Sequence, residues 1–406
     1  MEYGAALDWL YGVQQFGIKP GLENTRKLLK SLQLPDSGQR FLHVAGTNGK
    51  GSTCAFMESV LRAGGERTGL FTSPHLIQFR ERIKAFGSMM PETEIARSLT
   101  CLRDLVNGWD PHPTFFELTL ALALDWFART GVEIVVLETG MGGRLDSTNA
   151  ITPVLSVITP IAMDHQQWLG NTLEAIAAEK AGIIKNGVPV VSSPQHPDAE
   201  AVLRKTAAAA GTSIRFVDDP WTRTPLPLAG EHQQWNAALA LQALEMASCL
   251  PREAAITRGL AETSWPARFQ FLLDGHLILD GAHNPHSLAR LVATWQKEFP
   301  GEKAHLIFGA VEGKDHMHSL PLLIPIVSEA TFVTVDSPRA IPAGVLAEAW
   351  TETAPAIPCR SVSSLREALS GPVEGLPNRH LLCGSLYLCG EALSLLDGGK
   401  FESSAQ

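Results

Sequence analysis

The chain has 406 residues, of which 45% are hydrophobic and 18% charged, an ordinary composition for a globular protein. At about 100–200 residues per domain, this length predicts two or three domains. The net charge of −9 argues against a nucleic-acid surface, because such surfaces are basic. The six cysteines form no C-x-x-C pair, and the N-terminal MEYGAALDWLYGV lacks the Lys or Arg of a secretory signal. Because no apolar run is long enough to span a bilayer, we expect a cytoplasmic protein whose partners include neither nucleic acid nor a membrane.

The first predicted element is a strand at residues 41–45, FLHVA, which leads into the glycine-rich stretch AGTNGKGST. Apolar residues then recur at helical spacing from Cys54 to Leu61, and Gly64 and Gly65 supply a C-terminal stop. Glycines in such a loop let backbone N–H groups turn inward, and the N-terminus of the helix favours an anion. The order of strand, loop and helix therefore predicts a phosphate-binding loop, with an ordinary glycine-rich turn as the alternative.

Within this loop, Lys50 is placed to reach a terminal phosphate, and Ser52 or Thr53 to cap the helix or meet a metal ion. The familiar pattern GxxxxGK[ST] is not matched, because Val44 stands where its first glycine should fall and Gly51 separates Lys50 from Ser52. The shorter spacing leaves the physics of anion binding intact. It predicts a different family of nucleotide-binding proteins from the commonest one.

Further strand candidates alternate with helix-period segments along the rest of the chain. Several are runs of Val, Ile or Leu, which indicates a parallel sheet buried on both faces. At TSWPARFQ, a Pro, a Trp and an Arg separate a helical stretch from a new series of strands and helices, which predicts a domain boundary around residues 266–272. We therefore predict an α/β protein with a large, mostly parallel domain over residues 1–267, a smaller Rossmann-like domain over residues 268–406, and a ligand site in the cleft between them. The strand candidates are RTGLFTS (67–73), VEIVVLETG (132–140), TPVLSVIT (152–159), VPVVSS (188–193), HLILDGA (276–282), HLIFGA (305–310), ATFVTV (330–335) and HLLCGS (380–385).

Polar side chains follow several of these strands. Ligands gather at the carboxyl ends of strands in open α/β sheets, so Glu138, at the end of EIVVLE, is placed to hold Mg²⁺ against phosphates. His165 follows the next strand in TPIAMDHQQWLG, and Ser73 follows another in FTSPHL. Each residue has an ordinary alternative, namely a solvent-facing Glu, a core or surface His, and a Ser in a turn before Pro.

Lys180 lies in LEAIAAEKAGIIK, with Ile176 four residues before it and Ile183 three residues after it. It therefore shares the apolar face of a predicted helix. Burial makes the charged form of an amine costly and lowers its pKa, so a neutral amine there is open to modification or to pairing with anions. The alternative is a lysine whose ammonium extends to solvent.

In the predicted second domain, LILDGAHNPHS places Asp280, His283 and Asn284 at the end of a strand. Arg268, in the linker, is placed to grip a phosphate between the domains, and His283 is open to a role as a general acid or base. Both residues are also compatible with ordinary turn chemistry. The sequence has no G-x-S-x-G elbow and no zinc-type His/Cys spacing, so a covalent nucleophile is not indicated.

Taken together, these motifs resemble folylpolyglutamate synthase and its bifunctional relative dihydrofolate synthase, both of the Mur ligase superfamily. The likeness covers nearly the whole chain. It implies a two-domain Mur ligase-like fold, with an ATP-binding central-type domain and a C-terminal α/β domain. The motifs that carry it are HVAGTNGKGST, SPHL, ETGMGGRLDSTN, DHQQWLGNTLEAIAAEKAGI, the Asn of GEHQQWNAALA, WPARFQ and LDGAHNPHS.

The resemblance also implies three groups of site residues. A pterin or folate would bind at Thr114, Phe115, Phe116, Glu117, Leu145, Asp146 and Ser147, where Ser147 replaces an alanine frequent in relatives. Mg²⁺ would bind at Ser73, Glu138, His165 and a carbamylated Lys180, and the resemblance also allows a monovalent cation. Lys50, Lys180 and His165 would be catalytic, and ATP would bind at Thr47, Asn48, Gly49, Lys50, Gly51, Ser52, Asn236, Arg268, Asp280 and His283.

The implied reaction is the ATP-dependent addition of L-glutamate to the carboxylate of dihydropteroate or of a reduced folate. The carboxylate attacks the γ-phosphate of ATP to form an acyl phosphate, and the amine of glutamate then expels phosphate. We expect the enzyme to be a monomer. One rival reading is a Mur-type cell-wall peptide ligase, but the ~40 residues before the loop are too few for a nucleotide-sugar domain. The other rival is a P-loop protein that binds a nucleotide without ligating anything.

Overall fold

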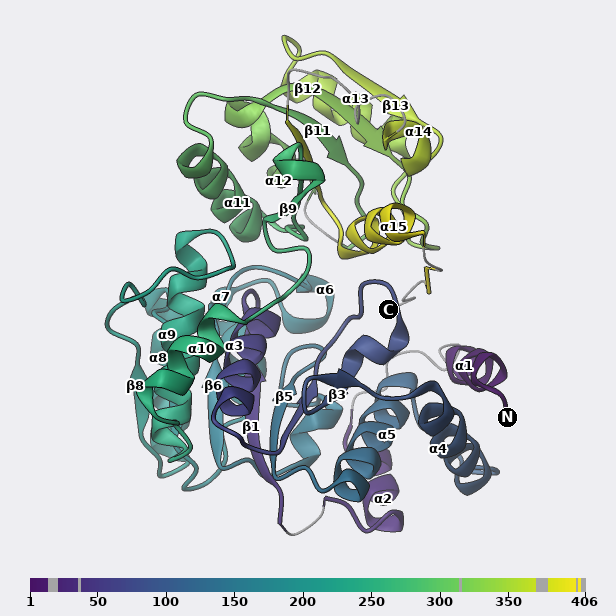
Figure 1. The fold of residues 1–406 in the computed structure, drawn as a ribbon, viewed down its shortest axis with the longest axis vertical. Coiled ribbons are helices and arrows are strands. Elements are labelled where there is room, and N and C mark those ends of the chain that lie inside the picture. The colour runs from purple at the N-terminus through teal and green to yellow at the C-terminus, as the bar shows by residue number, and fades with distance from the viewer. Residues whose placement is uncertain (14–20, 36–37, 314–315, 370–378, 399–400, 403–406) are drawn as a thin grey trace.

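The structure is a computed structural model that describes residues 1–13, 21–35, 38–313, 316–369, 379–398 and 401–402. Figure 1 shows a larger lobe, built from the N-terminal part of the chain, and a smaller lobe above it. The connection between them runs from α10 (Glu253–Ala261) to β9 (Gln270–Leu272). The predicted two-lobed α/β architecture is confirmed, and the cleft between the lobes determines where the site lies.

The larger lobe is built on a sheet that has eight strands in the described residues, in the order β4-β3-β2-β5-β1-β6-β7-β8. The strands from β2 to β8 in this order are parallel, and β3 and β4 add an antiparallel edge. Because β1 is central, the loops after β1, β5, β2 and β6 meet at one edge of the sheet. The bounds are β1 (Arg40–Ala45), β2 (Thr68–Phe71), β3 (Ile83–Ala85), β4 (Ser88–Met89), β5 (Ile134–Glu138), β6 (Leu155–Ile158), β7 (Val190–Ser192) and β8 (Ile214–Phe216).

Helices cover both faces of this sheet, because successive residues of its strands point to opposite sides. In β1, Leu42 and Val44 pack with α3, α9 and α10, whereas Phe41 packs with the cluster that contains α4 and α5. Both faces of the strand are therefore buried, as its continuous apolar sequence predicts. The helices of this lobe are α1 (Tyr3–Gly12), α2 (Glu23–Ser31), α3 (Lys50–Ala63), η2 (Phe79–Arg82), α4 (Glu92–Leu105), α5 (Phe115–Thr130), η3 (Ser147–Ala150), α6 (Gln166–Leu169), α7 (Leu173–Ala181), α8 (Pro197–Ala209) and α9 (Glu231–Met246), followed by α10.

The smaller lobe has its own sheet, with six strands in the described residues and the order β13-β12-β11-β14-β10-β9. The edge strand β9 is antiparallel to β10, and the other pairs are parallel. Separate apolar clusters lie on its two faces. Its elements are β9, η4 (Leu273–Gly275), β10 (Leu277–Leu279), α11 (Pro285–Glu298), β11 (Ala304–Phe308), α12 (His316–Leu323), η5 (Ile324–Ile326), β12 (Val327–Val333), α13 (Ala343–Thr353), β13 (Cys359–Val362), α14 (Leu365–Leu369), β14 (His380–Cys383) and α15 (Leu386–Asp397).

The predicted strands are all present, but the sequence pattern missed β3, β4, β8, β9 and β13. These have two to four residues each, which is too short for a clear alternation of apolar and polar side chains. The helix that carries Lys180 is present, but it ends at Ala181, so Ile183 lies beyond it and not on its apolar face. No helix in the described ranges is long and apolar enough to cross a membrane.

Candidate active site

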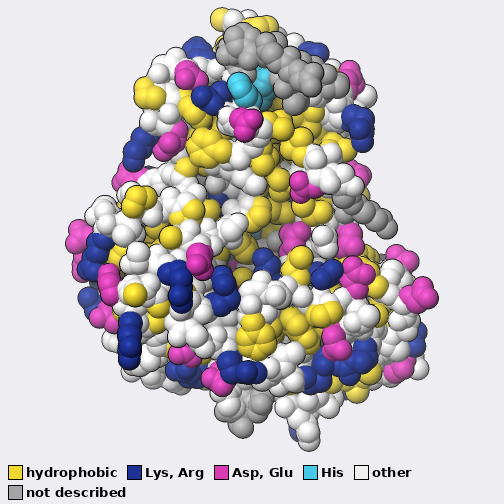
Figure 2. All heavy atoms as spheres, viewed as in Figure 1, with side chains coloured by type: hydrophobic (Ala, Val, Ile, Leu, Met, Phe, Trp, Pro, Cys, Tyr) yellow, Lys and Arg dark blue, Asp and Glu magenta, His cyan; other side chains and the backbone are white. Residues whose placement is uncertain are grey.

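A cavity of ≈ 1290 Å³ opens between the two lobes. It exceeds the roughly 300–1,000 Å³ of a pocket for one drug-sized molecule, so it has room for more than one ligand. Figure 2 shows hydrophobic side chains gathered along the waist where the lobes meet. The site residues that the family resemblance implies all line this cavity except Glu117, so residues from 47 to 283 come together in one place, whereas Thr53 and Asn284 are not part of its lining.

The glycine-rich loop runs from the end of β1 into α3. Gly49 is the N-cap of α3 and has a left-handed backbone with φ of 86°. A Cβ at Gly49 would lie 2.5 Å from Oδ1 of the buried Asn236 on α9, and a Cβ at Gly51 would lie 2.7 Å from Nε1 of Trp265 in the linker. The two glycines therefore let α9 and the linker approach the loop closely.

The backbone N–H groups of the loop fall into two sets: some bond a neighbouring segment of the protein, and others remain open. The N–H groups of Thr47 and Asn48 both donate to the carbonyl oxygen of Pro160, at 2.9 and 3.3 Å, and so fix the loop against the segment after β6. The first N–H groups of a helix lack intrahelical acceptors, so the amides open to an anion are those at the start of α3. The buried Ser52 Oγ makes no hydrogen bond within the described residues. An unmet hydroxyl beside unmet amides fits the binding of an anion or of a metal–phosphate complex.

Two lysines converge on this loop. Lys180, which is 4% exposed, donates from Nζ to the carbonyl oxygen of Gly46 at 2.7 Å. Lys50 donates to the same oxygen at 3.2 Å and to the carbonyl of Thr47 at 3.3 Å. Two ammonium groups around one carbonyl oxygen favour an anionic ligand beside them.

The carboxylate of Glu138 lies at the end of β5 and is buried. Its Oε2 accepts a hydrogen bond from the backbone N–H of Ser73 at 3.2 Å. Burial raises the pKa of Glu138 to about 7, while the positive charges of Lys50 and Arg268 act in the opposite direction. A divalent cation would favour the ionised carboxylate, because it adds a strong positive charge.

The other predicted metal ligands line the same cavity as this carboxylate. His165 follows β6 as the left-handed N-cap of α6, and its Nε2 lies 3.9 Å from Oδ2 of Asp164. The described residues contain no group of three or more His, Cys, Asp and Glu side chains close enough to hold a metal. The set still fits Mg²⁺ or Mn²⁺, because Mg²⁺ is usually held by one or two carboxylates, waters and substrate phosphates.

The smaller lobe contributes an anchored arginine. Asp280, at the end of β10, accepts hydrogen bonds from the backbone N–H groups of Phe269 and Ala282, both at 2.8 Å. Burial raises the pKa of the Asp280 carboxyl, and Arg268 opposes this shift. Asp280 thus fixes Phe269, the residue after Arg268, against the end of β10, and the Arg268 side chain lines the cavity.

Residues of the predicted pterin site have two roles: some line the cavity, and others support the segments that line it. Thr114, Phe116, Leu145 and Ser147 line the cavity, and the Phe116 ring lies directly over Gly140. Glu117 points elsewhere. Its Oε2 accepts the Thr114 backbone N–H at 2.7 Å, and its Oε1 accepts the Thr25 hydroxyl at 2.9 Å.

Asp146 supports the turn after β5. Its carboxylate accepts the backbone N–H groups of Gly140, Met141 and Thr148 and the Thr148 hydroxyl, at 2.5–3.0 Å. These bonds close the glycine-rich turn after β5. Glu117 is not among the residues that line the cavity, and its two carboxylate oxygens bond Thr114 at the start of α5 and Thr25 of α2; its contact with a pterin stays a prediction. Asp146 lines the cavity while it shapes the turn.

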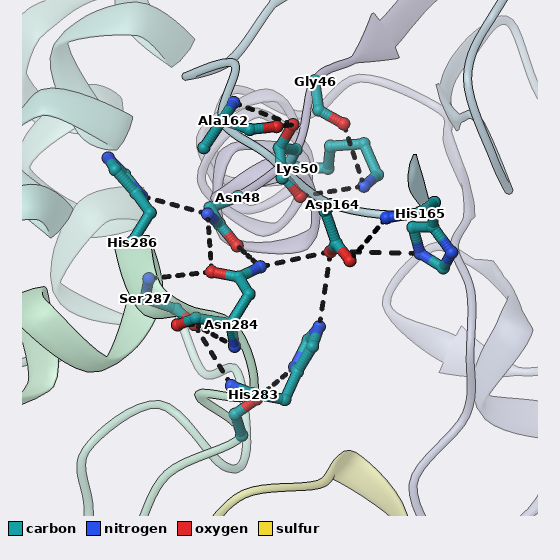
Figure 3. A network of polar contacts seen from close by, with 12 residues as sticks. Gly46, Asn48, Lys50, Ala162, Asp164, His165, His283, Asn284, His286 and Ser287 are labelled. Carbon is teal, nitrogen blue, oxygen red and sulfur yellow. Dashed lines mark hydrogen bonds and ion pairs between the residues drawn. The ribbon is translucent and has the colours of Figure 1, made fainter. Parts of the chain in front are cut away.

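A polar network crosses the cleft between the lobes (Figure 3). Asn48 in the glycine-rich loop and Asn284 at the start of α11 exchange hydrogen bonds, and Asn284 also donates to Asp164. His283 Nε2 lies 3.9 Å from the same Asp164 Oδ2. Sequence reasoning placed Asn284 at a strand end but gave it no role, because nothing in the sequence shows that it meets Asn48.

Ser385 and Tyr387 line the cavity and were also missed. Ser385 is the N-cap of α15 and lies two residues after the end of β14, whereas Asp280 directly follows β10. The rule that ligands gather at strand ends was the available signal for Ser385. No comparable signal marked Tyr387.

Comparisons with known proteins agree with this geometry. Two family models match the chain, the Mur ligase middle domain over residues 44–192 and the Mur ligase glutamate ligase domain over residues 267–382. The fold and the site therefore define a Mur-type ligase. The chain is 36% identical to the dihydrofolate synthase/folylpolyglutamate synthase of Bacillus subtilis, over 83% of this chain and 86% of the relative. It is 35% identical to the folylpolyglutamate synthase of Lacticaseibacillus casei, over 98% and 100%. The chain belongs to the folylpolyglutamate synthase/dihydrofolate synthase family.

Solved structures give the same result. The folylpolyglutamate synthase of Mycobacterium tuberculosis, solved with ADP and AMPPCP, matches with a TM-score of 0.89 and 28% identity, over 99% of this chain and 100% of that one. A bifunctional folylpolyglutamate synthase/dihydrofolate synthase with Mn, AMPPNP and L-glutamate bound matches with a TM-score of 0.86 and 31% identity, over 97% and 98%. These findings support a glutamate ligase over a cell-wall peptide ligase or a nucleotide-binding protein without ligase activity.

Proposed function

We propose that this chain uses ATP to join L-glutamate to the free carboxylate of a pteroyl substrate, either dihydropteroate or a reduced folate, and releases ADP and phosphate. The observation that carries the proposal is the convergence of Lys50 and Lys180 on the Gly46 carbonyl, beside the buried Glu138 and inside the interlobe cavity. This arrangement places the Lys50 ammonium where a phosphoryl group is transferred, with the Lys180 amine next to it for the carbamylation proposed below. The names and bound ligands of the relatives supply the substrate class.

The triphosphate would lie on the amides at the start of α3, with the Lys50 ammonium against its terminal phosphate. In the first step, the pteroyl carboxylate attacks the γ-phosphorus, the bond to the β-phosphate oxygen breaks, and ADP leaves. Lys50 and Arg268 stabilise the charge that develops on the transferred group. In the second step, the glutamate amine attacks the acyl carbon, loses a proton and expels phosphate. The interlobe position of the cavity keeps water from the acyl phosphate.

Ser73, Glu138 and His165 would hold a divalent cation in this site. Such a cation supplies neutralising charge between the β- and γ-phosphates when it is bound. Glu138 contributes the buried carboxylate, and the Ser73 backbone holds that carboxylate in place. A monovalent cation is proposed on the family resemblance alone, and the dependence of turnover on potassium tests it.

Lys180 is proposed to be carbamylated in the active enzyme. Its buried amine next to the Gly46 carbonyl is the right starting point, because an uncharged amine adds CO₂ to give a carboxylate and a proton. The product would balance the Lys50 charge and complete the oxygen ligands of the cation. Carbon-13 NMR of enzyme equilibrated with labelled bicarbonate should show a carbamate signal that Lys180→Ala lacks.

The pteroyl group would lie against Phe116 and Leu145, next to the Ser147 hydroxyl. We also place the enzyme in a reducing compartment such as the cytoplasm, because its six cysteines are free thiols. The deciding experiment measures incorporation of radiolabelled glutamate with dihydropteroate and tetrahydrofolate in parallel, with and without ATP. Label in one product defines a single activity, and label in both defines a bifunctional enzyme. Absence of ATP-dependent label with either substrate would refute the proposed function.

A further inference from the structure

The amide side chains of Asn48 and Asn284 join the two lobes directly. Asn284 Nδ2 donates to Asn48 Oδ1 at 3.1 Å, and Asn48 Nδ2 donates to Asn284 Oδ1 at 3.3 Å. The two residues are 236 positions apart in the chain. Figure 3 shows the amides facing each other, one from the loop before α3 and one from the start of α11. The phosphate loop is therefore tied to a helix of the opposite lobe.

Two further groups complete this contact. Asn284 Nδ2 also donates to Asp164 Oδ2 at 3.1 Å, and Asn48 Nδ2 lies 3.0 Å from His286 Nδ1. A side-chain NH₂ group has two hydrogens, so both hydrogens of each amide have an acceptor. We call Asn48, Asn284, Asp164 and His286 the interlobe clasp. Asn284 is 2% exposed, so its hydrogen bonds are shielded from water.

Asn284 has a second task, which by itself does not require an amide. It is the N-cap of α11, where its Oδ1 accepts the Ser287 N–H at 2.9 Å and the Ser287 hydroxyl accepts the Asn284 N–H at 3.1 Å. Asp is as good an N-cap as Asn. A carboxylate has no hydrogen to donate to Asn48 or Asp164. The donating NH₂ of Asn284 therefore serves the clasp and not the cap.

The clasp also orients the Asp164 carboxylate, which lies near two histidines of the site. Asp164 Oδ2 lies 3.9 Å from Nε2 of His165 in the larger lobe and 3.9 Å from Nε2 of His283 in the smaller lobe. Asn284 itself borders a smaller adjoining pocket, so it acts on the site through these neighbours. The reaction needs groups from both lobes in one geometry, and a displacement of about 1 Å is able to cost on the order of 10²-fold in rate.

We propose that Asn284 is a positioning residue for ligation, which holds the smaller lobe in register with the phosphate loop through its two donated hydrogen bonds. The inference rests on the proposed function and adds to it a residue that touches neither reacting group. It predicts that loss of the donors lowers kcat more than it weakens nucleotide binding, because the phosphate loop itself stays intact.

The test variant is Asn284→Asp, which keeps the size of the side chain and its capping oxygen. It removes both donors and sets a second carboxylate against Asp164. We expect kcat for glutamate addition to fall by about 10–100-fold, with a smaller change in AMPPNP affinity measured by calorimetry. Hydrogen–deuterium exchange should accelerate in the phosphate loop and at the start of α11. Because the cap is retained, the thermal midpoint should stay close to that of the wild type.

Two comparison variants separate the clasp from the cap. Ser287→Ala weakens the cap but keeps both Asn284 donors, so it should lower the thermal midpoint while phosphate-loop exchange stays slow. The double variant Asn284→Asp with Asp164→Asn reverses the donor and the acceptor, so it should restore slow exchange relative to Asn284→Asp alone.

Hydrogen exchange detects loss of the interlobe clasp even when the enzyme does not turn over. The experiment therefore tests the proposed function and the positioning role of Asn284 separately. A wild-type enzyme that adds no glutamate, yet shows faster loop exchange in Asn284→Asp, would refute the proposed function and the positioning role but leave the contact itself established. An active wild type with unchanged kcat in Asn284→Asp would overturn only the positioning role. Unchanged exchange in that variant would overturn the clasp.

Discussion

Lys50 and Lys180 donate to the same backbone oxygen, that of Gly46, although they lie on different helices. The shared acceptor brings two cations together at the carboxyl end of β1, with Glu138 of the neighbouring strand nearby. Like charges at short range repel, so this arrangement is most stable when an anion is bound or when Lys180 carries the proposed carbamate. The first prediction tests the role of Lys50.

Lys50→Ala should lower kcat for ATP-dependent glutamate addition by about 10²–10³-fold, the range seen when one donor to a developing charge is removed. The variant should remain folded, because Lys50 is only partly buried and its bonds go to its own loop. Turnover measured beside circular dichroism checks both statements. Near-wild-type turnover would refute the role of Lys50.

Glu117→Ala should lower the free energy of unfolding by about 2–3 kcal/mol, because it removes a capping bond and leaves the buried Thr25 hydroxyl without its acceptor. KM for the pteroyl substrate should stay near the wild-type value. Phe116→Ala is the matched variant, since its ring lines the cavity, and it should raise that KM. Urea denaturation and steady-state kinetics on both proteins distinguish the roles. A raised KM in a fully stable Glu117→Ala would support its implied contact with the substrate.

His43 gives the protein a defined sensitivity to acid. It is fully buried in β1, its Nε2 lies 2.8 Å from the Thr148 hydroxyl, and burial lowers its pKa to about 3. The unfolded chain, with a His pKa of about 6.5, therefore binds the proton more readily than the folded chain as pH falls from about 6.5 towards 3. Folding stability is retained above about pH 6.5 and should fall below it by about 1.4 kcal/mol per pH unit from this residue.

Urea denaturation at a series of pH values checks this slope. In His43→Gln the decline below about pH 6.5 should be shallower by about the same 1.4 kcal/mol per pH unit. If the slopes of the two proteins coincide, His43 is protonated in the folded state and the assignment is wrong.

Glu402 ties the C-terminal end of the chain to the loop that carries Ser73. Its Oε2 accepts the Phe79 N–H at 2.8 Å, its own N–H donates to the Ile77 carbonyl at 2.8 Å, and its carbonyl lies 2.9 Å from His75 Nε2. Glu402→Ala should speed hydrogen exchange at Phe79, whereas Glu402→Gln, which keeps an acceptor oxygen, should change it little. Equal exchange in the wild type and the alanine variant would show that the tail does not hold this loop.

Much of the site could be predicted because its residues lie at positions that the neighbouring sequence marks. The glycine-rich loop, Glu138 and Asp280 each follow a run of apolar residues, and the ends of parallel strands gather at one edge of a sheet. The burial of Lys180 was visible from Ile176 one helical turn away, even though α7 ends before Ile183. The short strands β3, β4, β8, β9 and β13 were not predictable, since two to four residues do not define a period.

The sequence by itself determined the order of the predicted strands and helices, the glycine-rich loop between β1 and α3 and the polar residues at strand ends, because these depend on backbone preference and on the spacing of neighbouring residues. Only the tertiary structure decided that Glu117 bonds Thr25 as well as the start of α5, and that Asn284 meets Asn48 across the cleft. Both outcomes depend on partners distant in the chain, Thr25 in the first case and the opposite lobe in the second. A hydrogen bond over such a separation follows from how two lobes pack, and that packing is a property of the whole fold.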